Sequence, residues 1–109
     1  MLERTVKVAI KKQLNLIGAY HHWPVQRGMG EPCLDCHGCY RGIYFAVEAK
    51  RPGKKPTDLQ EATISRIRAA GGLVFVVDNP EAAIDVAHCL KSHSTSPGAL
   101  YSPYPRAVD

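Results

Sequence analysis

The sequence lacks a hydrophobic run long enough to cross a lipid bilayer, which takes roughly 20 consecutive apolar residues. Its first residues also lack the cationic stretch followed by an apolar one that is typical of a secretory signal. These two absences argue against a membrane-spanning chain and against a secreted one. We therefore expect a soluble, intracellular protein with no membrane partner.

Cysteine is scarce and unevenly placed. Four cysteines occur, and Cys33, Cys36 and Cys39 lie in one short segment. Without a secretory signal, a disulfide framework is not expected, because thiols stay reduced inside cells. Thiolates at this spacing can bind zinc or an iron–sulfur cluster. A zinc site usually takes a further ligand from a second paired motif, whereas the remaining cysteine, Cys89, is isolated, so the pattern favours small buried side chains.

Acidic residues are few in the first two thirds of the chain. Residues 1–68 contain twelve Lys and Arg against six Asp and Glu, while residues 69–109 contain two against four. A basic excess of this kind suits a polyanionic partner such as nucleic acid. Many basic surfaces only keep a protein in solution, so charge supports a DNA partner without establishing one.

The spacing of apolar and turn-forming residues predicts an α/β domain with a mixed sheet. Apolar residues recur at helical spacing in the first segment, which stops at Gly18. Two later segments predict a hairpin with its turn near residues 38–42. From residue 43 to residue 77 we expect a strand, a helix and a second strand, and if the two strands are parallel neighbours, the connection between them is a right-handed crossover. The expected elements are a helix over 2–17, a short strand within 19–25, a loop over 26–32, a hairpin arm over 33–40, a strand over 43–50, a helix over 57–71, a strand over 73–77 and a helix over 80–90.

The second helix has a clear start signal. Thr57 is a natural N-cap, and Gln60 stands in the capping-box position three residues later. The strand that follows the helix, over residues 73–77, is a continuous run rich in β-branched residues, which is typical of a strand buried on both faces. The residues of the second helix that we expect to face the core include Leu59, Thr63, Ile67 and Ala70.

The end of the chain differs from the rest. Residues 93–109 contain repeated prolines and no hydrophobic periodicity. We expect a tail without a core of its own there. The domain is therefore predicted to span residues 1–92.

The strand over residues 43–50 ends in a charged pair, Glu48 and Lys50. Residues two apart on a strand share a face, so a carboxylate and an ammonium project together. Taken alone, such a pair is most often a solvated ion pair worth less than about 1 kcal/mol. Asp35 adds a second carboxylate if the hairpin folds it back beside Glu48. The backbone carbonyl of Ala49 would complete a set of hard oxygen ligands for Mg²⁺ or Mn²⁺.

These residues form an ordered set that resembles the PD-(D/E)XK nuclease superfamily. More narrowly, the chain is similar to the small stand-alone VRR-Nuc proteins of phages and bacteria. Leu34 stands where the superfamily's name has a proline. The resemblance covers about residues 1–90 and is carried by Leu34-Asp35, residues 42–50 with Glu48-Ala49-Lys50, Lys54-Lys55-Pro56-Thr57, Gln60 and residues 69–77.

The resemblance implies a restriction-endonuclease-like core in the order α-β-β-β-α-β-α and a divalent-metal-dependent DNA endonuclease. It also implies a homodimer that cuts branched DNA such as a four-way (Holliday) junction, in the cytoplasm of a bacterium or of a phage-infected cell. The implied roles are metal binding by Asp35, Glu48 and the Ala49 carbonyl, assistance to water or to the transition state by Lys50, orientation of water or phosphate by Gln60, and a further metal contact from Glu3 in the first helix.

Basic residues outside this set are expected to hold the DNA backbone without reading its sequence. A different class of function stays open, namely a non-catalytic nucleic-acid-binding module with structural zinc on Cys33, Cys36 and Cys39. The expected DNA contacts are Lys11, Lys12, Arg27, Arg51, Lys54 and Lys55.

Overall fold

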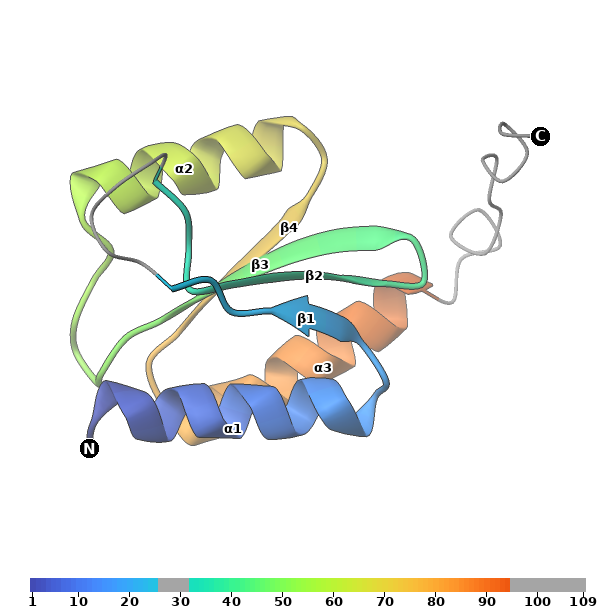
Figure 1. The fold of residues 1–109 in the computed structure, drawn as a ribbon, viewed down its shortest axis with the longest axis horizontal. Coiled ribbons are helices and arrows are strands. Elements are labelled where there is room, and N and C mark those ends of the chain that lie inside the picture. Colours follow the sequence, from blue (N-terminus) through green and yellow to red (C-terminus); the bar gives the residue numbers. More distant parts are fainter. Residues whose placement is uncertain (26–31, 95–109) are drawn as a thin grey trace.

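A computed structural model describes residues 1–25 and 32–94 of the chain (Figure 1). The fold is α/β, with a four-stranded mixed sheet flanked by three helices, and the predicted order of elements is confirmed. The elements are α1 (Glu3–Leu16), β1 (Tyr20–His22), β2 (Cys36–Tyr40), β3 (Ile43–Ala49), α2 (Asp58–Ala69), β4 (Leu73–Val77) and α3 (Pro80–Ser94).

Some expectations fall at or beyond the limits of the described residues. Most of the loop predicted over 26–32 and the tail from residue 95 onward lie outside them. The last helix is longer than predicted, because α3 continues to Ser94 and so includes the first residues assigned to the tail. None of the described helices is both long and apolar enough to span a membrane.

The sheet has the strand order β1-β2-β3-β4. The first three strands are joined in antiparallel pairs, whereas β3 and β4 are parallel, with Phe45 opposite Leu73 and Ala49 opposite Val77. A parallel pair requires a crossover connection, and α2 provides it. Figure 1 shows α1 and α3 on one side of the sheet and α2 on the other.

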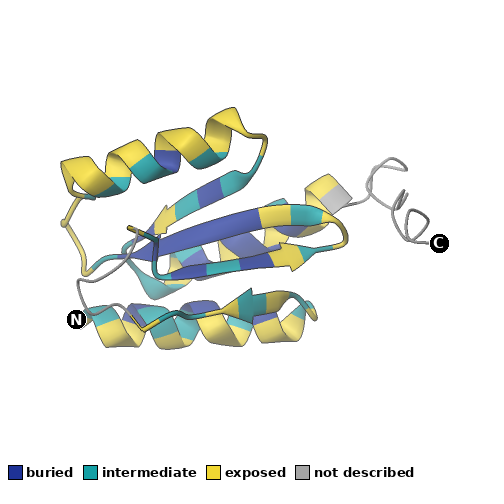
Figure 2. Cartoon of the chain, turned by 45° about the horizontal axis from the view of Figure 1, so that its top comes forward, coloured by how far each residue is buried: buried dark blue, intermediate teal, exposed yellow. Residues whose placement is uncertain are grey.

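The main core lies between the sheet and the layer formed by α1 and α3. Val6, Ile10 and Leu14 are buried at i, i+4 spacing on α1 and pack with Phe45 of β3. Figure 2 shows the resulting band of buried residues along the middle of the sheet. The predicted amphipathic first helix is therefore confirmed. Leu2, which precedes α1, is exposed.

The opposite face of the sheet is covered more thinly. Within α2, which is described in full, Ile64 is the buried residue, and it packs with Ala46 and Val74. The predicted apolar face of this helix is partly wrong, since Leu59 is 62% exposed and Ala70 is also exposed. A single helix over this face meets the sheet along a narrow stripe, so the flanking apolar positions remain in solvent.

The prediction that residues 73–77 are buried on both faces is wrong. β4 stands at the edge of the sheet, and Val76 is 41% exposed. Val76 is paired with Glu48 of β3. The β-branched run therefore reflects strand propensity rather than burial on both faces.

The β2–β3 hairpin closes through Arg41 and Gly42, which both have positive φ, at 49° and 85°. A two-residue loop with this backbone matches a type I′ turn, which suits the twist of antiparallel strands. Gly38, at the edge of the predicted turn, lies instead within β2. A Cβ there would collide with the carbonyl oxygen of Tyr20 and lie 2.9 Å from the ring of Phe45. Close packing of β1 on β2 thus depends on a glycine at this position.

We expect Gly38→Ala to lower the free energy of unfolding by about 1–3 kcal/mol, because the added methyl group overpacks the contact between β1 and β2. Chemical denaturation followed by circular dichroism measures this change. Cys39→Ala, at the exposed neighbouring position of the same strand, is the matched control and should change stability by less than about 0.5 kcal/mol. Equal stability of Gly38→Ala and the wild type would contradict the close approach.

Candidate active site

The hairpin brings the carboxylates of Asp35 and Glu48 together. The backbone N–H of Asp35 donates to Oε1 of Glu48 at 3.2 Å, and the backbone N–H of Ala49 donates to Oδ2 of Asp35 at 2.9 Å. The register that pairs Cys36 with Val47 sets these contacts, because it places the residue before β2 beside the end of β3. The hairpin thus folds Asp35 back beside Glu48, while the role of the pair as metal ligands stays a prediction.

Glu48 is buried, with 2% of its surface exposed. Burial raises the pKa of its carboxyl, the charge of Asp35 raises it further, and Lys50 and the Asp35 N–H act in the opposite direction. The Nζ atom of Lys50 lies 3.2 Å from Oε2 of Glu48. Glu48 is therefore ionised only at a cost, and an added cation beside it would offset that cost.

Gln60 links the start of α2 to the carboxylates. Its Oε1 accepts the Thr57 N–H at 2.9 Å, and its own backbone N–H donates to Oγ1 of Thr57 at 3.2 Å, which completes the predicted capping box. Its Nε2 donates to Oε2 of Glu48 at 2.8 Å. Since the cap requires an acceptor at Oε1, the amide nitrogen must face Glu48. One side chain therefore both starts the helix and orients the buried carboxylate.

The first helix contributes two charged residues to the same place. The Nζ atom of Lys7 lies 3.5 Å from Oε2 of Glu3 and 3.6 Å from Oδ1 of Asp35. Glu3 thus reaches the carboxylate cluster through Lys7. Lys7 was not predicted as a site residue, although its position one turn after Glu3 places both on one helix face. A pocket of about 450 Å³ is lined by Glu3, Lys7, Lys11, Trp23, Pro24, Asp35, Glu48 and Gln60.

A chain of hydrogen bonds holds Trp23 at the wall of this pocket. The indole N–H of Trp23 donates to Nδ1 of His21 at 2.8 Å, and Nε2 of His21 lies 2.8 Å from Oδ1 of Asn15. The Nζ atom of Lys11 lies 4.8 Å from the centre of the indole ring. Burial and the charge of Lys11 lower the pKa of His21, which suits a neutral ring that accepts a hydrogen bond. Trp23 was not predicted as a site residue.

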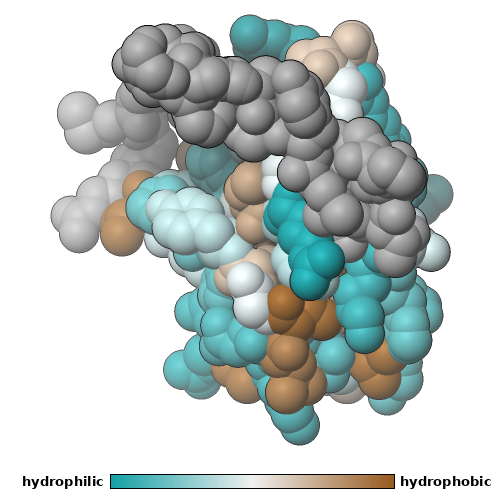
Figure 3. Space-filling view, turned by 90° about the vertical axis from the view of Figure 1, so that its right-hand side faces the viewer, coloured by the Kyte–Doolittle hydropathy of each residue, from teal (hydrophilic) through white to brown (hydrophobic). Residues whose placement is uncertain are grey.

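The site lies at one end of the molecule. β3 ends there, and α1 and α2 begin there (Figure 1). The opposite end, which contains the hairpin turn, shows a small group of apolar side chains among hydrophilic ones (Figure 3). Because α1 and α2 both begin at the end that holds the carboxylates, the positive ends of their helix dipoles point there, which favours an anionic ligand.

Lys11 lines the pocket, and the other predicted DNA contacts lie on α1, in the loop after β3 or outside the described residues. The loop after β3 is tied to the sheet by the Gly53 N–H, which donates to Oδ2 of Asp78 at 3.5 Å. Arg27 lies outside the described residues. The exposed residues of the predicted set are Lys11 and Lys12 on α1 and Arg51, Lys54 and Lys55 in the loop.

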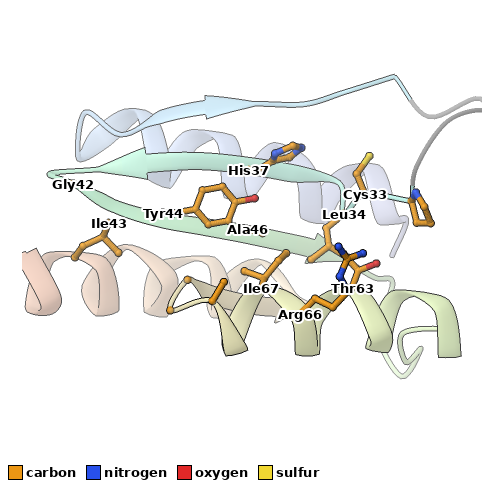
Figure 4. A pocket seen from close by; sticks show the side chains of 14 residues that line it. Cys33, Leu34, His37, Gly42, Ile43, Tyr44, Ala46, Thr63, Arg66 and Ile67 are labelled. Carbon is orange, nitrogen blue, oxygen red and sulfur yellow. The ribbon is translucent and has the colours of Figure 1, made fainter. Parts of the chain in front are cut away.

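A larger cavity, of about 740 Å³, lies between the hairpin and α2 (Figure 4). His37 and Tyr44 line it from the strands, and Arg66 and Ile67 line it from α2. The Nε2 atom of His37 is buried without a hydrogen-bond partner among the described residues. No Asp or Glu is found among the described residues that line this cavity. It therefore offers no carboxylate to a hard cation, and the smaller pocket is the candidate active site.

The clustered cysteines do not converge in the structure. Cys36 is buried in the main core, whereas Cys39 is exposed. Burial raises the pKa of the Cys36 thiol to about 12, which opposes the thiolate that zinc needs. Across residues 1–25 and 32–94, no group of three or more His, Cys, Asp or Glu side chains could hold a metal ion. The described residues therefore contain no assembled set of ligands for the structural zinc of the alternative, non-catalytic module.

Two carboxylates are nevertheless enough for Mg²⁺. This ion keeps several of its waters and is usually bound through one or two carboxylates together with phosphates of the substrate. Asp35 and Glu48 supply the carboxylate oxygens, and the Ala49 carbonyl belongs to the residue between Glu48 and Lys50. Glu3 is paired with Lys7 and lies farther out. The donor set fits the hard divalent cation predicted from the sequence.

No family model matches the chain, and a search of curated proteins gave no match. The resemblance to nucleases therefore stays a prediction from the residues. Any statement of function depends on the geometry of Asp35, Glu48, Lys50 and Gln60.

We expect the stability of the wild type relative to Glu48→Gln, without metal, to fall as pH rises, because burial raises the folded-state pKa of Glu48. With a raised pKa, the contribution of this group to stability is fully present below the unfolded-state pKa and is lost as pH rises through the folded-state value. Thermal unfolding in EDTA, from about pH 4 to about pH 8, measures the difference between the two proteins.

The stability of Glu48→Gln relative to that of the wild type should rise with pH through this window and then level off. Glu61→Gln, which changes an exposed carboxylate of α2, is the control and should differ little from the wild type. A wild type that gains stability relative to Glu48→Gln over the same range would contradict a raised pKa.

Proposed function

We propose that the protein is a divalent-metal-dependent DNA endonuclease with a restriction-endonuclease-like core of the PD-(D/E)XK type, similar to VRR-Nuc proteins. The observation that carries the proposal is that the buried Glu48 carboxylate directly contacts Asp35, Lys50 and Gln60. Glu48 accepts hydrogen bonds from the Asp35 backbone and the Gln60 amide and pairs with Lys50. Metal-dependent phosphodiester hydrolysis uses carboxylates to hold the metal and a nearby cation to stabilise developing charge.

Asp35 and Glu48 would hold Mg²⁺ or Mn²⁺, together with the carbonyl of Ala49. The bound cation supplies Lewis acidity toward the phosphate and toward water. Gln60 keeps Glu48 in one orientation through its Nε2 hydrogen bond, so the carboxylate does not have to reorganise during the reaction. Lys50 stands beside the carboxylates and would stabilise negative charge as it builds on the phosphate.

The pairing of Lys50 with Glu48 also has a stability cost that supports a functional role. The side chain of Glu48 is 3% exposed and that of Lys50 is 14% exposed. A pair with so little exposure loses hydration, and that loss can exceed the attraction between its charges. A solvated surface pair, the common alternative for such a motif, does not match this degree of burial.

The basic residues near the site would hold the DNA backbone. Arg51, Lys54 and Lys55 follow the site directly in sequence, and Lys11 and Lys12 lie on α1. Contacts of this kind neutralise phosphates and carry no sequence information. The resemblance extends the proposal to a cytoplasmic homodimer that cuts branched DNA at two symmetric positions.

We expect Asp35→Asn and Lys50→Met to lower cleavage of a labelled four-way junction in Mn²⁺ by at least about 100-fold, because Asp35 would hold the metal and Lys50 would stabilise charge on the scissile phosphate. Gel assays with junction, flap and duplex DNA measure the rates, and EDTA should abolish them. Glu61→Gln is the control with unchanged activity. Circular dichroism should show the same fold in all variants.

Undiminished cleavage by Asp35→Asn or Lys50→Met would contradict the assignment of the site. A wild type that contains about one zinc per chain, binds DNA without regard to Mg²⁺ and cleaves none of the three DNA forms would favour the zinc-binding module instead.

The two contacts of Gln60 can be separated by experiment. Thr57→Ala removes the hydroxyl that accepts the backbone N–H of Gln60 and leaves the contact between Gln60 and Glu48. Gln60→Ala keeps that hydroxyl contact but removes the Oε1 that accepts the Thr57 N–H and the Nε2 that donates to Glu48. Each should cost about 0.5–2 kcal/mol of stability as a lost cap. Only Gln60→Ala should also lower the cleavage rate, by roughly tenfold. Equal cleavage rates for the two variants would limit Gln60 to its capping role.

A further inference from the structure

Each of the two site carboxylates has a lysine beside it. Lys50 pairs with Glu48, as the motif predicts, and Lys7 approaches Oδ1 of Asp35 from α1. The lysines belong to different elements and lie on different carboxylates. The function proposed above uses Lys50 and leaves Lys7 without a role.

Lys7 is loosely held between two carboxylates. Its Nζ is 3.5 Å from Glu3 and 3.6 Å from Asp35, and its side chain is 34% exposed. Strong charge-assisted hydrogen bonds are shorter, at about 2.7–2.9 Å. Lysine also carries its charge on a flexible stem of four carbons. The ammonium can therefore change partners while α1 keeps its backbone in place.

The two oxygens of Asp35 face different groups. Oδ2 accepts the backbone N–H of Ala49 at 2.9 Å, and Oδ1 faces the ammonium of Lys7. A divalent cation bound through Oδ1 would stand next to that ammonium. Like charges at such a distance repel each other, more strongly where exposure to solvent is low, and the side chain of Asp35 is 11% exposed.

The charges around the site balance in the absence of metal. A divalent cation adds an excess of positive charge, which an anionic DNA backbone can neutralise. Lys7 lines the same pocket as the carboxylates, so a phosphate bound there is the nearest new partner for its ammonium. The acidic groups around the site are Glu3, Asp35 and Glu48, and the basic groups are Lys7, Lys11 and Lys50.

We propose, on the basis of the nuclease function above, that Lys7 is a second cation of the active site that exchanges Asp35 for a DNA phosphate when the metal binds. Lys7 and the metal compete for Asp35, and the same lysine then helps to hold the substrate. It therefore weakens metal binding to the free protein and strengthens DNA binding to the metal-loaded protein.

The test uses the full chain and two binding measurements. Lys7→Gln should bind Mn²⁺ about three- to tenfold more tightly by isothermal titration calorimetry, because the competing charge is gone. It should bind a fluorescent junction in Ca²⁺ about tenfold more weakly by anisotropy, because a phosphate contact is lost. Lys7→Arg keeps the charge and should retain DNA affinity within roughly threefold.

Arg4→Gln is the matched control, since it removes one positive charge from an exposed position of the same helix outside the pocket. It should change Mn²⁺ affinity less than about twofold. Weaker Mn²⁺ binding by Lys7→Gln would mean that Lys7 only positions Asp35, and unchanged DNA affinity would mean that it does not reach phosphate. Either result would overturn the exchange.

Failure of the nuclease function is distinguishable from failure of this proposal. A wild type that cleaves no DNA, while Lys7→Gln shows both opposite shifts, would overturn the nuclease assignment and support the exchange. A wild type that binds no Mn²⁺ would overturn both.

Discussion

Two hydrogen bonds between Asp35 and the end of β3 determine the arrangement of the candidate site. The Asp35 backbone donates to Glu48, and the Asp35 carboxylate accepts from the backbone of Ala49. Because each contact joins a side chain to the backbone of the other arm, the register of the hairpin also sets the distance between the carboxylates. A slip of one residue would turn Glu48 to the opposite face of the sheet. The type I′ turn at Arg41 and Gly42 therefore contributes to the site from the far end of the hairpin.

The other parts of the fold each bring one partner to this pair. The capping box places Gln60 against Glu48, α1 presents Lys7 to Asp35, and Lys50 is the first residue after β3. The core between the sheet and the α1-α3 layer keeps these elements in position. Burial raises the free energy of the ionised carboxylates, and the surrounding cations lower it again. This balance makes the site responsive to an added metal ion or phosphate.

Local signals in the sequence predicted most of the fold. Alternation, helical spacing, a capping box and turn residues gave the correct order of elements and brought Asp35 beside Glu48. The errors concern how elements pack, since neither helix periodicity nor strand propensity says how much of a sheet one helix covers. Leu59 and Val76 are exposed for this reason. Lys7 could not be assigned because its contact with Asp35 depends on where α1 docks.

The central claim is that Asp35 and Glu48 together form a site for a divalent cation, and calorimetric titration of the wild type and of Glu48→Gln with Mn²⁺ tests it most directly. The variant keeps the size of the side chain and removes one negative charge of the pair. The account predicts a single Mn²⁺ site in the wild type and an affinity at least about tenfold lower in Glu48→Gln. Equal affinity in the two proteins, or no binding by the wild type, would contradict it.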